Sequence, residues 1–205
     1  MKMMRLFLFN FGRAYDSAEV AKRAHINKDD AKRELLNLEK IGLITKRTFY
    51  KNISRVKKIK GKNRKIIRKV IEVRRKVHGW TLDRKFTYLK ELQSLLINTI
   101  LLKGDEIIQR FHGVGKIKLI IVSGVFIQNI DSRLDILIVG DKINNAKVNA
   151  IVKRMEAEIG KELQYASFDT QDFKYRMSIY DRLVRDVLDY PHEVLLDKVG
   201  IKLSF

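Results

Sequence analysis

The stretch ELLNLEKIGLITKR, residues 34–47, changes from a helical to an extended pattern at a single glycine. Upstream of Gly42, apolar residues recur at Ala31, Leu35 and Leu38, the spacing of one face of an α-helix. Downstream, LITKRTFY has the β-branched and aromatic content of a strand. Because glycine is favoured just after the last turn of a helix, the sequence predicts that a helix ends here and a strand begins.

Capping residues extend this pattern toward the amino terminus. Asp16 or Ser17 can cap a short helix, SAEVAKRA, and Asn27 can cap a second helix after the turn HIN. The face of the second helix opposite the apolar stripe is mostly basic and polar: Lys28, Lys32, Arg33 and Asn37.

The net charge of +19 is concentrated in the first two fifths of the chain. Residues 1–80 hold 24 Lys and Arg against 7 Asp and Glu, whereas residues 81–205 hold 19 against 17. Between Lys51 and Lys76 there are 13 basic residues and one acid, Glu72. Apolar residues alternate with these basic ones, which favours a β-hairpin over a solvated tail, with its turn at residues 60–64. Such a hairpin indicates a polyanionic partner.

The order of short helices, turn, amphipathic helix and basic hairpin resembles the winged helix-turn-helix domain of transcriptional regulators. The resemblance covers about residues 3–78, and ELLNLEKIGLITKR is its most specific element. It implies that residues 28–40 enter a major groove and that the hairpin at 53–75 is a wing against phosphates or a minor groove. Beside the helix residues, the implied contacts to double-stranded DNA are Lys57, Lys58, Lys60, Lys62, Arg64 and Lys65.

The remainder of the chain predicts a helical connector and a small mixed α/β layer. Residues 81–112 form the connector, in which Asp83 can cap a helix. From residue 113 onward the patterns predict strand, strand, helix, strand and one long final helix that ends at Pro191. The predicted fold class is therefore α+β, with a module at 1–80, a connector at 81–112 and a second domain at 113–205.

A polar turn after the first of these strands and an acid in the second resemble the nucleotidyltransferase-like domain of the polymerase-beta type. That family has Gly-Ser after strand one, Asp-x-Asp in strand two and a third acid on a later strand, which together hold magnesium ions. Here Ser123 and Gly124 occupy the turn and Asp135 the second acid position, while Arg133 replaces the first acid.

Three departures argue against catalysis. Arginine has no lone pair for a cation, the turn carries Val125 where a hydroxyl is expected, and the third strand, ELQYASF, has no central carboxylate. We therefore expect no metal, cofactor or catalytic residue, and a vestigial site in which Arg133 and Asp135 form an ion pair. Asp131 or Glu162 would have to complete a rearranged site if the enzyme were active, and Arg133 could alternatively hold a phosphate.

Composition excludes several other classes. The chain has no cysteine, so disulfides and thiolate zinc sites are excluded, and its four histidines are scattered. No apolar run approaches the roughly 18 residues of a membrane span, and the patch in MKMMRLFLFNFG is too short for a signal peptide. The expected protein is a cytoplasmic DNA-binding regulator without membrane association, whose second domain serves homodimerisation, a protein partner or ligand sensing. An active nucleotidyltransferase and an RNA-binding protein are the alternatives.

Overall fold

The computed structural model describes residues 1–60, 66–97, 102–129 and 132–201, and for residues 56–60 and 66–70 it describes the backbone alone. The protein combines helices with strands that form two separate sheets in these ranges, as expected of the α+β class. It divides into two compact units: Asn10–Leu89, and Met1–Phe9 together with Lys90–Phe205.

The first nine residues belong to the second unit, which differs from the predicted module at 1–80. They form α1 (Lys2–Phe9), which contacts the end of α6 (Asn145–Ile159). Arg5 Nη1 donates to the carbonyl oxygen of Glu158 at 3.1 Å. Gly160 follows with φ 87°, and a β-carbon on it would lie 2.6 Å from the carbonyl carbon of Arg5. Glycine here allows both the left-handed turn and the close approach of α1.

The unit Asn10–Leu89 contains the two predicted helices and a two-stranded antiparallel sheet. Its elements are α2 (Ser17–Ala24), α3 (Lys28–Lys40), β1 (Ile44–Lys60) and β2 (Ile66–Leu82). The predicted change from helix to strand around Gly42 is confirmed, and Gly42 has φ 80°. An isolated bridge between Tyr15 and Trp80 adds a backbone pair beside the base of the sheet.

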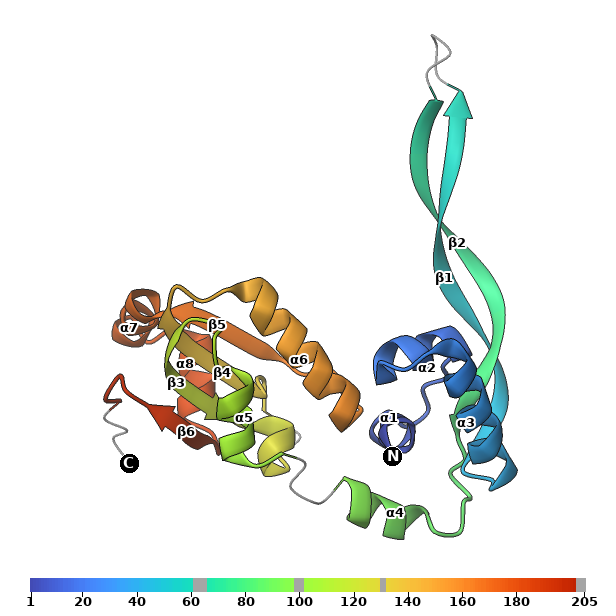
Figure 1. The fold of residues 1–205 in the computed structure, drawn as a ribbon, viewed down its shortest axis with the longest axis horizontal. Helices are drawn as coiled ribbons and strands as arrows, with labels where there is room; N and C mark the ends of the chain where they lie inside the picture. Colours follow the sequence, from blue (N-terminus) through green and yellow to red (C-terminus); the bar gives the residue numbers. More distant parts are fainter. Residues whose placement is uncertain (61–65, 98–101, 130–131, 202–205) are drawn as a thin grey trace. The chain divides into compact units, whose positions relative to one another are not determined.

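The sheet is one continuous ribbon and not a strand followed by a separate hairpin at 53–75. Its register runs without a break from Ile44 opposite Leu82 to Lys60 opposite Ile66. Figure 1 shows the twisted ribbon extending well beyond α2 and α3 of its own unit. A strand of 17 residues spans roughly 55 Å at about 3.3 Å per residue. In the part of the chain that the structure describes, the far part of the ribbon thus lies beyond the helices of its own unit.

The second unit contains a four-stranded mixed sheet of order β5-β4-β3-β6. Its strands are β3 (Lys116–Val122), β4 (Ile136–Asp141), β5 (Tyr165–Asp169) and β6 (Glu193–Asp197). β3 is antiparallel to β4 and to β6, whereas β4 and β5 are parallel and are connected through α6. The continuous apolar runs of β3 and β4 arise because helices cover both faces of the sheet.

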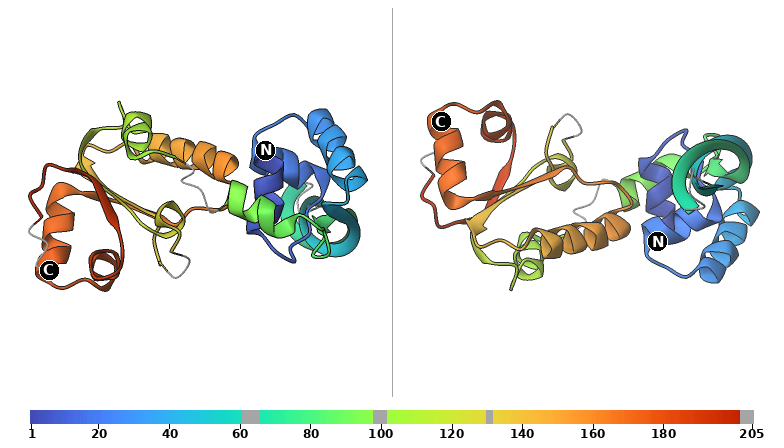
Figure 2. Two further views of the ribbon diagram at one scale, coloured as in Figure 1. Left: turned by 90° about the horizontal axis from the view of Figure 1, so that it is seen from below. Right: turned by 90° about the horizontal axis from the view of Figure 1, so that it is seen from above.

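Alternate residues of these strands enter two separate cores. Figure 2 shows the helices on the two faces of the sheet, with α5 and α6 on one side and α7 and α8 on the other. Ile120, Val122 and Ile138 pack with α6 and with α5 (Gly104–Arg110) on one face. The opposite face, which includes Leu119 and Val139, packs with α7 (Thr170–Ser178) and α8 (Arg182–Leu188).

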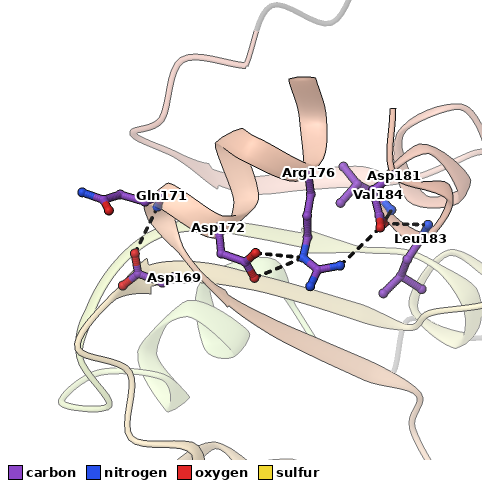
Figure 3. Close-up of polar contacts among 7 residues, drawn as sticks. All are labelled: Asp169, Gln171, Asp172, Arg176, Asp181, Leu183 and Val184. Carbon is purple, nitrogen blue, oxygen red and sulfur yellow. Dashed lines mark hydrogen bonds and ion pairs between the residues drawn. The ribbon is translucent and has the colours of Figure 1, made fainter. Parts of the chain in front are cut away.

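The prediction of one long final helix is wrong. α7 ends at Ser178, Tyr180 adopts φ 55°, and Asp181 caps α8 by accepting from two backbone N–H groups. Arg176 joins the two helices, because its Nη1 lies 3.2 Å from Asp181 while its Nε lies 3.1 Å from Asp172 of its own helix (Figure 3). After Pro191 the chain forms β6, which the sequence reasoning did not anticipate.

The predicted connector helix is also shorter than expected. Asp83 accepts from the backbone N–H of Lys85 at 2.9 Å in a turn, and α4 begins only at Leu89 and ends at Leu96. Residues 98–101, where this helix was predicted to continue, lie outside the described residues.

Candidate nucleic-acid interface and the predicted catalytic remnant

Caps and a buried stripe determine which face of α3 is exposed. Asn27 Oδ1 accepts from the backbone N–H groups of Asp29 at 2.9 Å and Asp30 at 2.7 Å. The apolar stripe Ala31, Leu35 and Leu38 is buried in its unit. The exposed residues of the helix outside this stripe are mostly basic or polar, with one acid, Asp29: Lys28, Asp29, Lys32, Arg33, Leu36, Asn37 and Lys40. The structure thus brings together all four helix residues predicted to contact DNA.

The charges on this face are only loosely held. Arg33 pairs with Asp30, and Lys32 Nζ lies 4.0 Å from Asp29 Oδ1. The Arg33 side chain is 73% exposed. Exposed pairs of this kind contribute between nothing and about 1 kcal/mol, so both cations can exchange their partners for phosphates or base edges.

Leu36 is a feature that the sequence reasoning missed. Its side chain lies among the basic residues of the outer face and is 55% exposed. The signal was present, because Leu36 follows Leu35 directly and so cannot share the stripe at residues 31, 35 and 38. An apolar contact beside hydrogen-bonding residues suits the methyl group of a thymine.

An ion-pair network connects the ribbon with α2. Lys51 Nζ lies 2.8 Å from Asp16 Oδ2 and 3.1 Å from Glu19 Oε2. Burial alone raises the pKa of Asp16, but hydrogen bonds from Lys51 and from the backbone of Glu19 outweigh it and hold this pKa below its usual value. Burial alone lowers the pKa of Lys51, yet both carboxylates raise it above its usual value. Lys51 therefore fixes the ribbon at its base.

The distal ribbon places like charges opposite each other. Lys57 lies opposite Lys69 and Lys58 opposite Arg68 in the register. Directly opposed like charges destabilise an antiparallel pair by roughly 0.2–1 kcal/mol. A polyanion would neutralise both pairs, which makes this part of the ribbon a candidate phosphate-binding surface.

The predicted wing residues differ in what the structure describes of them. Lys57, Lys58 and Lys60 belong to β1, with their backbone alone described, whereas Lys62, Arg64 and Lys65 lie outside the described residues. Nearer the base, the guanidinium carbon of Arg74 lies 4.6 Å from the ring centre of Tyr50, and Tyr50 is 60% exposed. This stacked pair was not among the predicted site residues: Arg74 lies in the charged segment, and Tyr50 directly precedes it.

In the second unit, Asp135 is a structural residue of the turn that contains Ser123 and Gly124. It is 3% exposed. Its Oδ1 accepts from the backbone N–H of Val125 at 2.9 Å, and its Oδ2 accepts from the backbone N–H of Gln164 at 2.8 Å. Each carboxylate oxygen thus accepts one backbone hydrogen bond, and the buried side chain joins the turn to the segment before β5.

The Ser-Gly turn packs directly on this carboxylate. Ser123 Oγ donates to the carbonyl oxygen of Leu134. The backbone N–H of Ser123 donates to the backbone carbonyl oxygen of Asp135 at 2.9 Å. Gly124 has φ 59°, and a β-carbon on it would collide with Oδ1 of Asp135. Ser123, Gly124 and Asp135 therefore lie together, through contacts that close the turn.

Arg133 does not form the expected ion pair with Asp135. Its Nη1 lies 2.8 Å from Asp186 Oδ2 of α8, and its side chain is 54% exposed. Residues two apart before a strand need not share a side, because residues 133–135 precede β4 and lack its regular pleat. Arg133 and Asp135 consequently have different partners: Arg133 pairs with Asp186, and Asp135 accepts from backbone N–H groups.

One question is whether the described acidic residues form a metal site. Across the part of the chain that the structure describes, no group of three His, Cys, Asp or Glu side chains is placed to hold a metal ion. Asp131, which could have completed a rearranged site, lies outside that part.

Comparison with protein-family models, with curated proteins and with solved structures finds no match for this chain. Among the helices of the described ranges, none combines the length and apolar character that crossing a membrane requires.

Proposed function

We propose that this protein is a sequence-specific regulator of transcription that binds double-stranded DNA through the unit Asn10–Leu89. The observation that carries the proposal is the exposed outer face of α3, where Asn37 is exposed and Arg33 is held only by an exposed pair with Asp30 that a base edge can replace. The ribbon supplies phosphate contacts, as a long wing would. The second unit is a nucleotidyltransferase-like domain without catalysis, which serves dimerisation, partner binding or ligand sensing.

The direct test is selection from a random duplex library by the full-length chain. Sequence-specific binding predicts enrichment of one motif, whereas recovery of all sequences in equal measure would contradict it. On the enriched site, Arg33→Ala or Asn37→Ala should each cost about 1–3 kcal/mol of binding free energy and much less on random DNA. Lys22→Ala is the matched control, because Lys22 is an exposed basic residue of α2 and does not belong to α3.

RNA binding is the second candidate function, and the exposed Tyr50 with its stacked Arg74 favours it. Bases of single strands stack on such aromatic side chains. Competition at equal salt between duplex DNA of the enriched sequence and single-stranded RNA separates the two functions. Preference for RNA that disappears in Tyr50→Ala would replace the DNA proposal.

Catalytic inactivity has its own test. The chain incubated with labelled nucleoside triphosphates and magnesium should transfer no nucleotide, because Asp135 already accepts two backbone hydrogen bonds. Transfer that is abolished by Asp135→Ala would show that the domain is an active enzyme.

A further inference from the structure

A pocket opens on the side of Arg133, within the second unit. It has a volume of about 270 Å³ and is lined by Asn129, Ser132, Arg133, Arg182, Asp186 and Tyr190. This volume lies just below the roughly 300–1,000 Å³ of pockets that bind drug-sized ligands. The pocket therefore suits a smaller molecule.

Two arginines supply hydrogen-bond donors to the pocket. A guanidinium has five N–H groups, and Nη1 of Arg133 lies 2.8 Å from Asp186 Oδ2 in an ion pair that lacks hydrogen-bond geometry. The pair holds the guanidinium beside Asp186 and leaves its N–H donors available to a ligand. In the described ranges no side chain pairs with Arg182, the first residue of α8. Two arginines against one aspartate leave one excess positive charge at the pocket.

The remaining lining residues complete a polar surface with one aromatic wall. Ser132 Oγ is buried and has no hydrogen-bond partner among the described residues. Buried hydroxyls are normally hydrogen-bonded, so an unsatisfied one in a pocket indicates a missing partner. The ring of Tyr190 is 61% exposed and can cover an apolar part of a ligand.

We propose that this pocket binds a small oxyanion, namely a phosphate monoester or a carboxylate, between the guanidinium groups of Arg133 and Arg182. Guanidinium groups bind both oxyanions through paired N–H donors, and the hydroxyl of Ser132 supplies a further contact. Asp186 acts as the positioning residue that holds Arg133. The inference is independent of DNA binding, since all six lining residues belong to the second unit.

The test is calorimetric titration of the full-length chain with inorganic phosphate, phenyl phosphate and benzoate. The two aromatic probes distinguish a phosphate ester from a carboxylate. Because the chain carries a net charge of +19 and attracts anions elsewhere, the decisive comparison is between two variants of one helix, Arg182→Gln and Arg185→Gln. Arg185 is also exposed on α8, pairs with Asp189 and does not line the pocket.

Arg182→Gln should weaken the preferred probe about tenfold or more, and Arg185→Gln should leave it within about twofold. Arg133→Lys, which keeps the charge but loses the fork of donors, should also weaken binding. Unfolding temperatures equal to that of the wild type establish that Arg182→Gln and Arg185→Gln are folded. Absence of binding by all three probes, or equal losses in both glutamine variants, would overturn the proposal.

Discussion

Replacing Asp135 tests whether its carboxylate has a structural or a catalytic role. The side chain is 3% exposed and accepts from the backbone N–H groups of Val125 and Gln164. In Asp135→Ala both donors remain buried without an acceptor. In Asp135→Asn one oxygen remains, while the amide NH₂ faces an N–H group that also donates.

The expected magnitudes follow from these two hydrogen bonds. Leaving a buried donor unsatisfied costs about 1–3 kcal/mol, so Asp135→Ala should lower the free energy of unfolding by roughly 2–6 kcal/mol. Asp135→Asn removes one acceptor and should cost about half as much. Asp189→Ala is the control, because its side chain is 53% exposed and should contribute less than about 1 kcal/mol.

Urea unfolding of each variant, followed by circular dichroism, measures the free energy of unfolding. The same titration with magnesium or manganese measures whether a metal stabilises the protein. Wild type and Asp189→Ala should respond to neither metal. Equal stability of Asp135→Ala and Asp189→Ala would contradict a structural role for the Asp135 carboxylate. That role would also be contradicted if a metal stabilises the wild type stoichiometrically and this effect is lost in Asp135→Ala.

Three further predictions concern the ribbon and the turn. The affinity for duplex DNA should fall with salt with a log-log slope of roughly −4 to −7, and this slope should flatten when four wing residues become Gln: Lys60, Lys62, Arg64 and Lys65. Asp16, whose pKa is lowered, contributes stability that is lost as the pH falls below about 4, so Lys51→Met should show a shallower acid loss in thermal unfolding than the wild type. Gly124→Ala should destabilise by at least about 1–3 kcal/mol in urea, because φ 59° is strained for alanine and its β-carbon meets Asp135. The first prediction is contradicted if the wing variant keeps the wild-type salt slope. The second is contradicted if Lys51→Met loses stability with acid in parallel with the wild type, and the third if Gly124→Ala keeps the wild-type urea midpoint.

Local signals allowed much of the unit Asn10–Leu89 to be predicted. The caps Asp16 and Asn27, the stripe beginning at Ala31 and the glycine at 42 act over three or four residues, and each is where the sequence places it. The continuity of the ribbon was less evident, because the pairing of residues 44–60 with 66–82 depends on a register that extends across the whole segment.

Errors in the second unit arose where tertiary contacts decide the outcome. The apolar period from Phe173 to Val187 fits one helix, but Asp181 caps a new helix and Arg176 pairs across the break. The partner of Arg133 could not be found from sequence, since Asp186 lies 53 positions later on another element. Long-range pairs of this kind leave no local spacing to recognise.

The ribbon shows how composition, stability and function are connected in this chain. A two-stranded sheet is marginal in water unless it packs against something, and here the register adds opposed cations at Lys57 with Lys69 and at Lys58 with Arg68. Lys51 fixes the base through two carboxylates, whereas the distal half has one acid, Glu72. The order of that half should therefore depend on bound anions. Amide exchange of residues 53–60 should slow when duplex DNA is added, and exchange in β3 should remain unchanged.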